Sequence, residues 1–299
     1  MSYDVPRESV KFYILDGCPK EIRFMSPFPC GHPEVDSAKA YLYEVKNSDQ
    51  AVVFVHGVGR RRLSYLDFYP ERLSRNGFTA IMPVLPFHYD RVVQGHEHYD
   101  KFIKGPTETM ERKFYQAVVD IRTCVDFLEK SGYEHIHIMG VSSGGMIATI
   151  TMAVDKRIER GVLIITGGNL EIISWHSIGT KIYRIGKSWR AHKEKSLEIQ
   201  KELDDCVRSF SSIEDLERIP SFFRYDPSLF AKLIDNSGVM MFSALLDPWI
   251  PKKSSDDLWR RLGEPVRVML PSGHLTSHLL FKRLILNRSV EFLSRGSVR

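Results

Sequence analysis

The 299-residue chain has few cysteines and no pattern in which cysteine or histidine would bind a metal ion. The cysteines form no C-x-x-C pair, and none lies near a histidine at metal-ligand spacing. They are Cys18, Cys30, Cys124 and Cys206. We therefore expect reduced thiols, as in a cytoplasmic protein, and no metal or other cofactor. A Cys18–Cys30 disulfide is the less favoured alternative.

Long apolar runs are also missing. No stretch approaches the ~20 apolar residues that cross a bilayer, and residues 1–7 lack the basic-then-apolar pattern of a signal peptide. The net charge of +5 is small for this length, and no zinc-finger or RNA-binding signature occurs. We expect a cytoplasmic protein with no membrane span and no nucleic-acid partner. Its oligomeric state, a homodimer included, stays open.

The chain does contain a regular alternation of strand and helix patterns. Short continuous apolar runs are typical of strands that are covered on both faces of a parallel sheet. Such runs occur at residues 51–55, 78–84, 135–139, 161–165, 239–245 and 266–270. Helical spacing predicts helices between them, most clearly over 107–130, and a last one over 276–294. This alternation predicts an α/β fold with a mostly parallel sheet flanked by helices.

Two segments depart from this alternation. Residues 10–15 and 40–46 are rich in strand-forming residues and predict antiparallel strands ahead of the core. Residues 170–235 contain no clean buried strand, and they show charged residues, helical spacing and several aromatic residues. We expect a core of residues 1–169 and 236–299, with 170–235 as a helical cap insertion over the site. The aromatic residues disfavour a disordered linker.

The segment Gly140-Val141-Ser142-Ser143-Gly144 follows an apolar strand and precedes an apolar helix. In that context G-x-S-x-G indicates a nucleophile elbow, a tight and strained turn that lifts the serine above the sheet edge. The glycines leave room for the turn. We predict Ser142 as the nucleophile. Ser143 is a rival with poorer flanking residues, and a glycine-rich turn without catalysis is the alternative.

A second motif, Val55-His56-Gly57-Val58-Gly59, ends the strand that begins at residue 51. Acyl transfer creates an oxyanion, which needs two positioned backbone N–H donors. We predict an oxyanion hole made by the N–H groups of Ser143 and Val58. His56 is expected to be a structural hydrogen-bonding residue and not a base.

An acid and a base follow the last two strands. Asp247 comes after strand 239–245, where the carboxyl end of a parallel strand opens onto the site. His274 follows the last strand, and from there it can take the proton of the serine while the acid orients it. The alternative for Asp247 is an Asp-Pro turn initiator. His278 competes with His274 but looks helical.

The order Ser142, Asp247, His274 is that of the α/β-hydrolase arrangement. The segments VVFVHGVG, HIHIMGVSSGG, ALLDPWIP and LPSGH resemble the α/β-hydrolase superfamily, from about residue 40 to 294, and most closely its dienelactone-hydrolase and carboxylesterase-like branches. The resemblance implies an eight-stranded sheet, a catalytic triad without metal and an acyl-serine intermediate. Val141 is not the His, Glu or Asp common in well-known lipases, esterases and peptidases, so the substrate subclass stays open.

We therefore predict a serine esterase that cleaves a small carboxylic ester or thioester. A peptide or C–C bond cleaved by the same triad, or a non-catalytic binding homologue, are the alternatives. The intact triad argues against a binding homologue, and a peptidase of this fold usually carries a further domain. His88 and Arg91 follow a core strand, and Trp175 lies in the insertion. We take these three as candidate substrate contacts, against the alternatives of a solvated loop and of simple cap packing.

Overall fold

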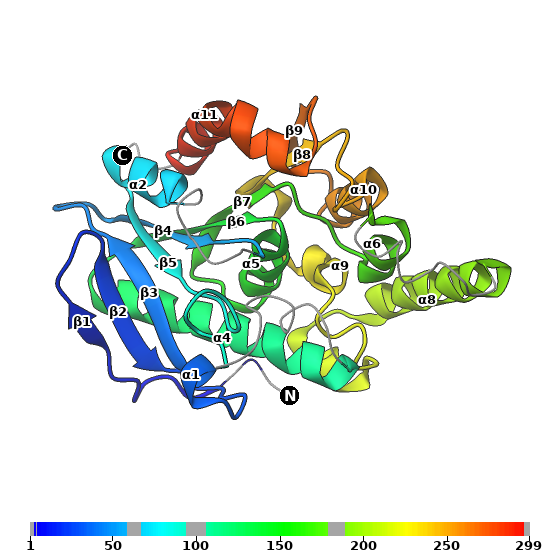
Figure 1. Cartoon of the computed structure of the whole chain (residues 1–299), viewed down its shortest axis with the longest axis horizontal. Coiled ribbons are helices and arrows are strands. Elements are labelled where there is room, and N and C mark those ends of the chain that lie inside the picture. Colours follow the sequence, from blue (N-terminus) through cyan, green and yellow to red (C-terminus); the bar gives the residue numbers. More distant parts are fainter. Residues whose placement is uncertain (1–2, 4, 59–66, 94–105, 179–188, 296–299) are drawn as a thin grey trace.

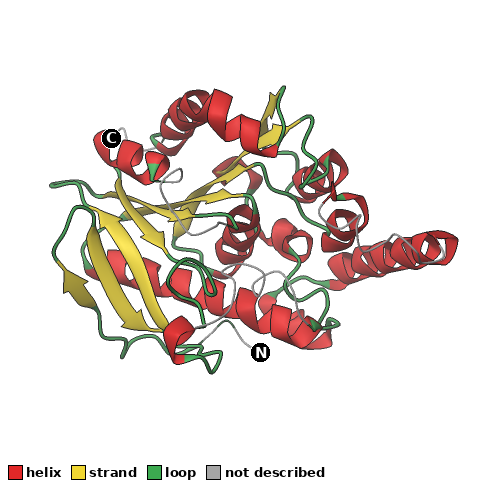
Figure 2. Ribbon diagram, in the orientation of Figure 1, coloured by secondary structure: helices red, strands yellow, loops and turns green. Residues whose placement is uncertain are grey.

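A computed structural model of the protein describes residues 3, 5–58, 67–93, 106–178 and 189–295. Figure 1 shows a twisted sheet that crosses the molecule, with helices on both of its faces. Figure 2 shows the same arrangement by secondary structure.

The sheet has nine strands in the order β1-β2-β3-β5-β4-β6-β7-β8-β9. The pairs β1–β2, β2–β3 and β3–β5 are antiparallel. The remaining pairs, from β5–β4 to β8–β9, are parallel. The strands are β1 (Tyr13–Leu15), β2 (Lys20–Met25), β3 (Ser37–Tyr43), β4 (Gln50–Val55), β5 (Thr79–Pro83), β6 (His135–Val141), β7 (Ile158–Ile164), β8 (Val239–Ala244) and β9 (Val266–Leu270). The predicted mostly parallel sheet of about eight strands is confirmed, and it has nine strands.

The helices fill the connections between the strands. They are α1 (Pro33–Asp36), α2 (Phe68–Arg75), α4 (Thr107–Lys130), α5 (Ser143–Val154), α6 (Leu170–His176), α8 (Trp189–Ser209), α9 (Pro227–Phe230), α10 (Lys252–Arg261) and α11 (His274–Leu293). The predicted helix over 107–130 is confirmed at both ends.

The core consists of two clusters, one on each face of the sheet. Successive side chains of a strand point to opposite faces, so the apolar run of β4 feeds both clusters. Val53 packs with α4 and α5, and Phe54 packs with Tyr69 of α2 and Ile285 of α11. Each fully buried side chain of this size contributes roughly 1.5–3 kcal/mol. This double burial explains why the sequence of β4 has no polar alternation.

Of the segment 170–235 between β7 and β8, the structure describes residues 170–178 and 189–235, and these hold helices joined by turns and short loops, with no strand among them. Its side chains Phe210, Phe223 and Phe230 are buried in the same cluster as α4 and α5. The buried carboxylate of Asp226 accepts hydrogen bonds from the N–H groups of Asn169 (2.9 Å), Leu170 (2.6 Å) and Ser228 (2.9 Å). The segment is therefore joined to the core at its start. That it caps the site stays a prediction.

Two further observations concern the cysteines and the hydropathy of the helices. All four cysteines are unpaired, so no disulfide joins Cys18 to Cys30. None of the helices in the described part of the chain combines the length and the hydropathy required to cross a membrane.

Candidate active site

Ser142 occupies the turn between β6 and α5. Its φ of 55° and ψ of −122° lie in a region that non-glycine residues rarely adopt, and holding it there costs about 1–3 kcal/mol. The surrounding structure fixes this backbone at both ends. The Ser142 N–H donates to the carbonyl of Ile164 (2.9 Å), and its carbonyl accepts from Gly145 N–H (2.9 Å) and from Thr166 Oγ1 (2.7 Å). Thr166 was not among the residues predicted from sequence, although its position just after the end of β7 was an available signal.

The flanking glycines are required by close contacts. A Cβ on Gly144 would lie 2.3 Å from the carbonyl oxygens of both Val55 and His56. A Cβ on Gly140 would lie 2.5 Å from the carbonyl oxygen of Gly144. Since backbone oxygens cannot give way cheaply, only glycine fits at either position. The reason predicted for the G-x-S-x-G spacing is confirmed.

The loop after β4 passes beside the serine. A Cβ on Gly57 would lie 3.1 Å from the Cβ of Ser142. The N–H of Val58 donates to the Ser143 hydroxyl at 2.9 Å. The two residues expected to supply the oxyanion hole thus contact each other at the N-terminus of α5, where the helix dipole favours negative charge. Their use as oxyanion donors stays a prediction.

His56 is fully buried and both of its ring nitrogens are engaged. Nδ1 donates to the carbonyl of Gly57 (2.8 Å), and Nε2 accepts from the N–H of Leu85 (3.0 Å). Burial lowers the pKa of His56 to about 4. His56 is therefore a neutral structural residue, as expected, which fixes the loop after β4 against the end of β5.

His274 and Asp247 form a hydrogen-bonded pair, with 2.6 Å between Nδ1 and Oδ2. The other carboxylate oxygen accepts from the N–H groups of Trp249 (2.8 Å) and Ile250 (2.9 Å). The Asp247 side chain is 1% exposed and that of His274 is 14% exposed. A carboxylate held in this way keeps the proton on Nδ1 and leaves Nε2 as the acceptor. The two roles weighed for Asp247 from the sequence therefore belong to different oxygens of the same carboxylate. Oδ1 closes the turn, and Oδ2 contacts His274.

His278 is held by a different partner. Its Nδ1 lies 3.0 Å from the hydroxyl of Tyr69 on α2, and burial lowers its pKa to about 4. The geometry thus favours His274 over His278 as the base. Among the described residues, no hydrogen bond joins the Ser142 hydroxyl to His274. That contact of the triad stays a prediction.

Comparison with known proteins gave matches only at the level of structure. No protein-family model and no curated protein matched the chain. An α/β hydrolase from Penicillium sp. sh18 superposes with a TM-score of 0.61 at 14% identity, over 92% of this chain and 97% of that one. The chain has the α/β-hydrolase fold.

Two further neighbours are similar in the same way. An esterase of Pyrococcus furiosus gives a TM-score of 0.56 at 14% identity, over 96% of this chain and 91% of that one. An acylaminoacyl peptidase of Pyrococcus horikoshii gives 0.63 at 14% identity, over 96% of this chain but 42% of that one. Identities this low establish the α/β-hydrolase fold and not a branch within it. The dienelactone-hydrolase or carboxylesterase-like assignment stays a prediction.

Within this α/β-hydrolase fold, the contacts of Arg91 are those of a buried structural residue. Its side chain is 2% exposed and pairs with Asp120 of α4 at 2.8 Å. Its guanidinium also donates to the carbonyls of Val35 and Val84. These partners argue against the expectation that Arg91 contacts a substrate. They also argue against its alternative, a solvated loop.

The other two candidate substrate contacts have different surroundings. His88 is fully buried, its Nδ1 donates to the carbonyl of Pro86 (2.9 Å), and its ring lies 5.1 Å from that of His56. His88 therefore packs next to the structural residue His56. Trp175 is half-buried on α6, next to the start of the insertion. A substrate role for each stays a prediction.

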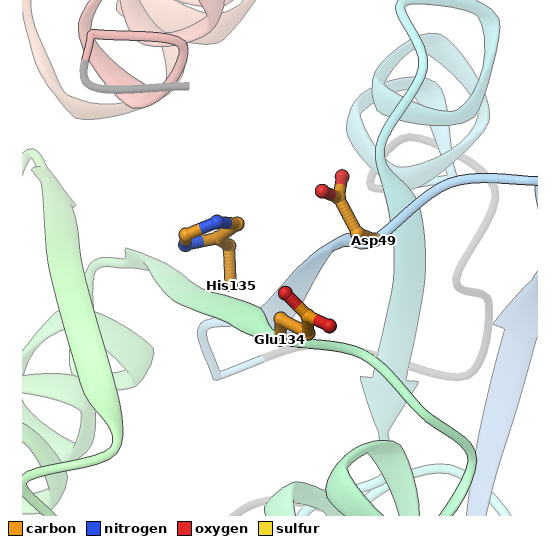
Figure 3. Close-up of side chains that lie close together, drawn as sticks. All are labelled: Asp49, Glu134 and His135. Carbon is orange, nitrogen blue, oxygen red and sulfur yellow. The ribbon is translucent and has the colours of Figure 1, made fainter. Parts of the chain in front are cut away.

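Three side chains that could share a metal ion lie at the amino ends of β4 and β6, away from the carboxyl ends where the candidate active site lies. Asp49 precedes β4, and Glu134 and His135 are at the start of β6; their ligand atoms lie within 4.8 Å of one another (Figure 3). His135 Nδ1 also contacts Glu159 Oε1 at 2.9 Å. These residues are at the amino ends of parallel strands, whereas Ser142, Asp247 and His274 follow the carboxyl ends. An ion bound there would take no part in chemistry at Ser142.

Proposed function

We propose that the protein is a serine hydrolase that cleaves a carboxylic ester or thioester through an acyl-serine intermediate. The observation that carries the proposal is the strained backbone of Ser142, held between two sterically required glycines at the N-terminus of α5. Strain of this kind persists only where the surrounding structure maintains it, and it is common at active sites. The His274–Asp247 pair at the same edge of the sheet supports it.

In the proposed mechanism, Ser142 Oγ attacks the carbonyl carbon while His274 Nε2 takes its proton. The N–H groups of Val58 and Ser143 hold the oxyanion. His274 then gives the proton to the departing alcohol or thiol, which leaves an acyl-serine. Water attacks this ester, His274 takes its proton, and the acid departs as Ser142 regains its hydrogen. Asp247 keeps Nδ1 protonated and stabilises the imidazolium throughout.

A fluorophosphonate probe tests the proposal, because it reacts covalently only with an activated serine. We expect the wild type and Ser143→Ala to be labelled and Ser142→Ala not to be labelled. Ser143→Ala is the matched control, since it removes the neighbouring hydroxyl, with its hydrogen bond from the Val58 N–H, but keeps the Ser142 hydroxyl and the Ser143 N–H. Labelling lost in Ser143→Ala but kept in Ser142→Ala would refute the assignment, and so would a folded wild type that takes no label. A panel of esters and thioesters of rising acyl length would then define the substrate.

A further inference from the structure

Several large apolar side chains next to the candidate base and acid are exposed to solvent. Single exposed leucines are ordinary, but a group of them marks an interaction surface. We define the apolar patch as Leu246 (74% exposed), Leu275 (68%), Leu279 (72%), Trp249 (49%) and Ile178 (50%). Leu246 directly precedes Asp247, and Leu275 directly follows His274.

Backbone contacts show that the patch is one surface. The N–H of Leu246 donates to the carbonyl of Ser272 (3.0 Å), so the loops after β8 and β9 lie side by side. The N–H of Ile178 donates to the carbonyl of Pro248 (2.8 Å), which brings the end of α6 to the same loop. Leu275 and Leu279 lie four residues apart and so share one face of the first turns of α11. In Figure 1 this end of α11, coloured orange, lies beside β8 and β9.

The charged side chains beside the apolar patch that have no ion-pair partner among the described residues are basic. Lys252 and Lys253 follow Trp249 closely, and Lys282 and Arg283 lie one turn beyond Leu279, all four exposed. Residues 274–290 contain no acidic residue, and the acid in residues 245–253 is Asp247, which is buried against His274. Among the described residues, Lys253 and Arg283 have no ion-pair partner, while Lys252 pairs with Asp256. The patch is therefore apolar with a basic border.

We propose that the apolar patch docks the protein on an anionic lipid surface and that the substrate is an acyl ester of such a lipid. Leucine and tryptophan enter the interfacial layer, and the basic side chains contact acidic headgroups. A second copy of the chain fits the patch less well, because a two-fold contact would place its basic border against itself. The substrate part rests on the proposed function, whereas the docking part does not.

Sedimentation with lipid vesicles tests the docking without any catalysis. The probes are vesicles of phosphatidylcholine and phosphatidylglycerol in equal parts, and vesicles of phosphatidylcholine alone. We expect the wild type and Ser142→Ala to bind the anionic vesicles equally, to bind the neutral ones much more weakly, and to be released by salt because exposed charges are screened. A wild type that stays in the supernatant with anionic vesicles would overturn the proposal.

Variants then assign the surface. We expect Leu279→Glu to weaken vesicle binding at least about tenfold, since it loses the burial of one leucine. Lys253→Gln and Arg283→Gln should each weaken it about fivefold, as expected for one basic side chain near an anionic surface. The matched control is Ile14→Glu, which changes an apolar side chain that is 54% exposed on β1, at the opposite edge of the sheet. The proposal fails if Leu279→Glu binds like Ile14→Glu.

The same variants separate this proposal from the proposed function. Leu279→Glu should lose hydrolysis of vesicle acyl esters and keep that of a short water-soluble ester. Vesicle binding by a wild type that no fluorophosphonate labels would support the docking and contradict the hydrolase. A concentration-dependent dimer that Leu279→Glu abolishes, with no vesicle binding by the wild type, would assign the patch to a second copy and overturn the docking.

Discussion

At the scale of single residues, Asp247 shows how one side chain serves both the fold and the proposed chemistry. Its Oδ1 closes the turn after β8 through two backbone N–H groups, and its Oδ2 faces His274. The turn therefore orients the carboxylate before any substrate arrives. Under the proposed mechanism, a pair oriented in this way would raise the rate, because no rearrangement is needed in the transition state.

The base assignment gives a prediction at this scale. Changing His274→Gln should lower kcat/KM for an ester substrate by at least about a thousandfold, because no group would then take the serine proton. Changing His278→Gln should lower kcat/KM by less than about tenfold, since that histidine contacts Tyr69. Steady-state kinetics of the two variants, with folding checked by circular dichroism, make the comparison. The opposite ranking would assign the base to His278.

Single residues were predictable from sequence where local flanks determine their position. Ser142 lies between a strand and a helix, with glycines two residues away on either side, and Asp247 and His274 lie within a few residues of the ends of β8 and β9. Arg91 also follows a strand, yet it turns into the interior. Its position depends on the carboxylate of Asp120, which is 29 residues away on α4. No local pattern could reveal that partner.

At the scale of elements, the Arg91–Asp120 pair joins the loop after β5 to α4 and to the end of α1. Removing one member of a buried pair leaves the other charge without compensation, which costs about 3–5 kcal/mol. We therefore expect Arg91→Leu to lower the free energy of unfolding by about that amount, measured by urea denaturation. The double variant Arg91→Leu/Asp120→Leu should recover part of the loss. A stable Arg91→Leu protein with only a raised KM would instead restore the substrate-contact hypothesis.

Elements were predictable where their pattern is strong. The helix α4 follows from apolar residues at helical spacing. The strand β9 was predicted as well, but its expected burial is wrong, because β9 is the edge strand and only Leu270 is buried. β2 was missed because its sequence, KEIRFM, has charged side chains on the exposed face, and only Ile22 and Phe24 are buried. The order of strands in the sheet could not be predicted, because it depends on contacts between segments far apart in the chain.

At the scale of the whole molecule, buried neutral histidines make stability depend on pH. Burial lowers the pKa of His56, His137 and His278 from 6.5 to about 4. The unfolded chain therefore takes up these protons at a higher pH than the folded protein does. Their stabilising contribution is complete above about pH 6.5 and is lost as the pH falls from 6.5 towards 4.

His137 offers the clearest test of this effect, because it lies on β6, away from the candidate active site, and its Nε2 contacts Gln50. Between pH 7 and pH 5 each such histidine should cost about 2 kcal/mol of stability. We expect the fall in the free energy of unfolding over this range to be about 2 kcal/mol smaller in His137→Gln than in the wild type. Urea denaturation at the two pH values measures it. Parallel pH profiles would show that His137 is protonated at similar pH in both states.

Under the proposed roles, the last helix has a consequence for biosynthesis. The nucleophile is made midway through the chain, but the base is the first residue of α11, which packs on β7, β8 and α2. A ribosome that stops between the codons of Ser142 and His274 releases a polypeptide with the serine and no base. Turnover would therefore report that translation had passed His274.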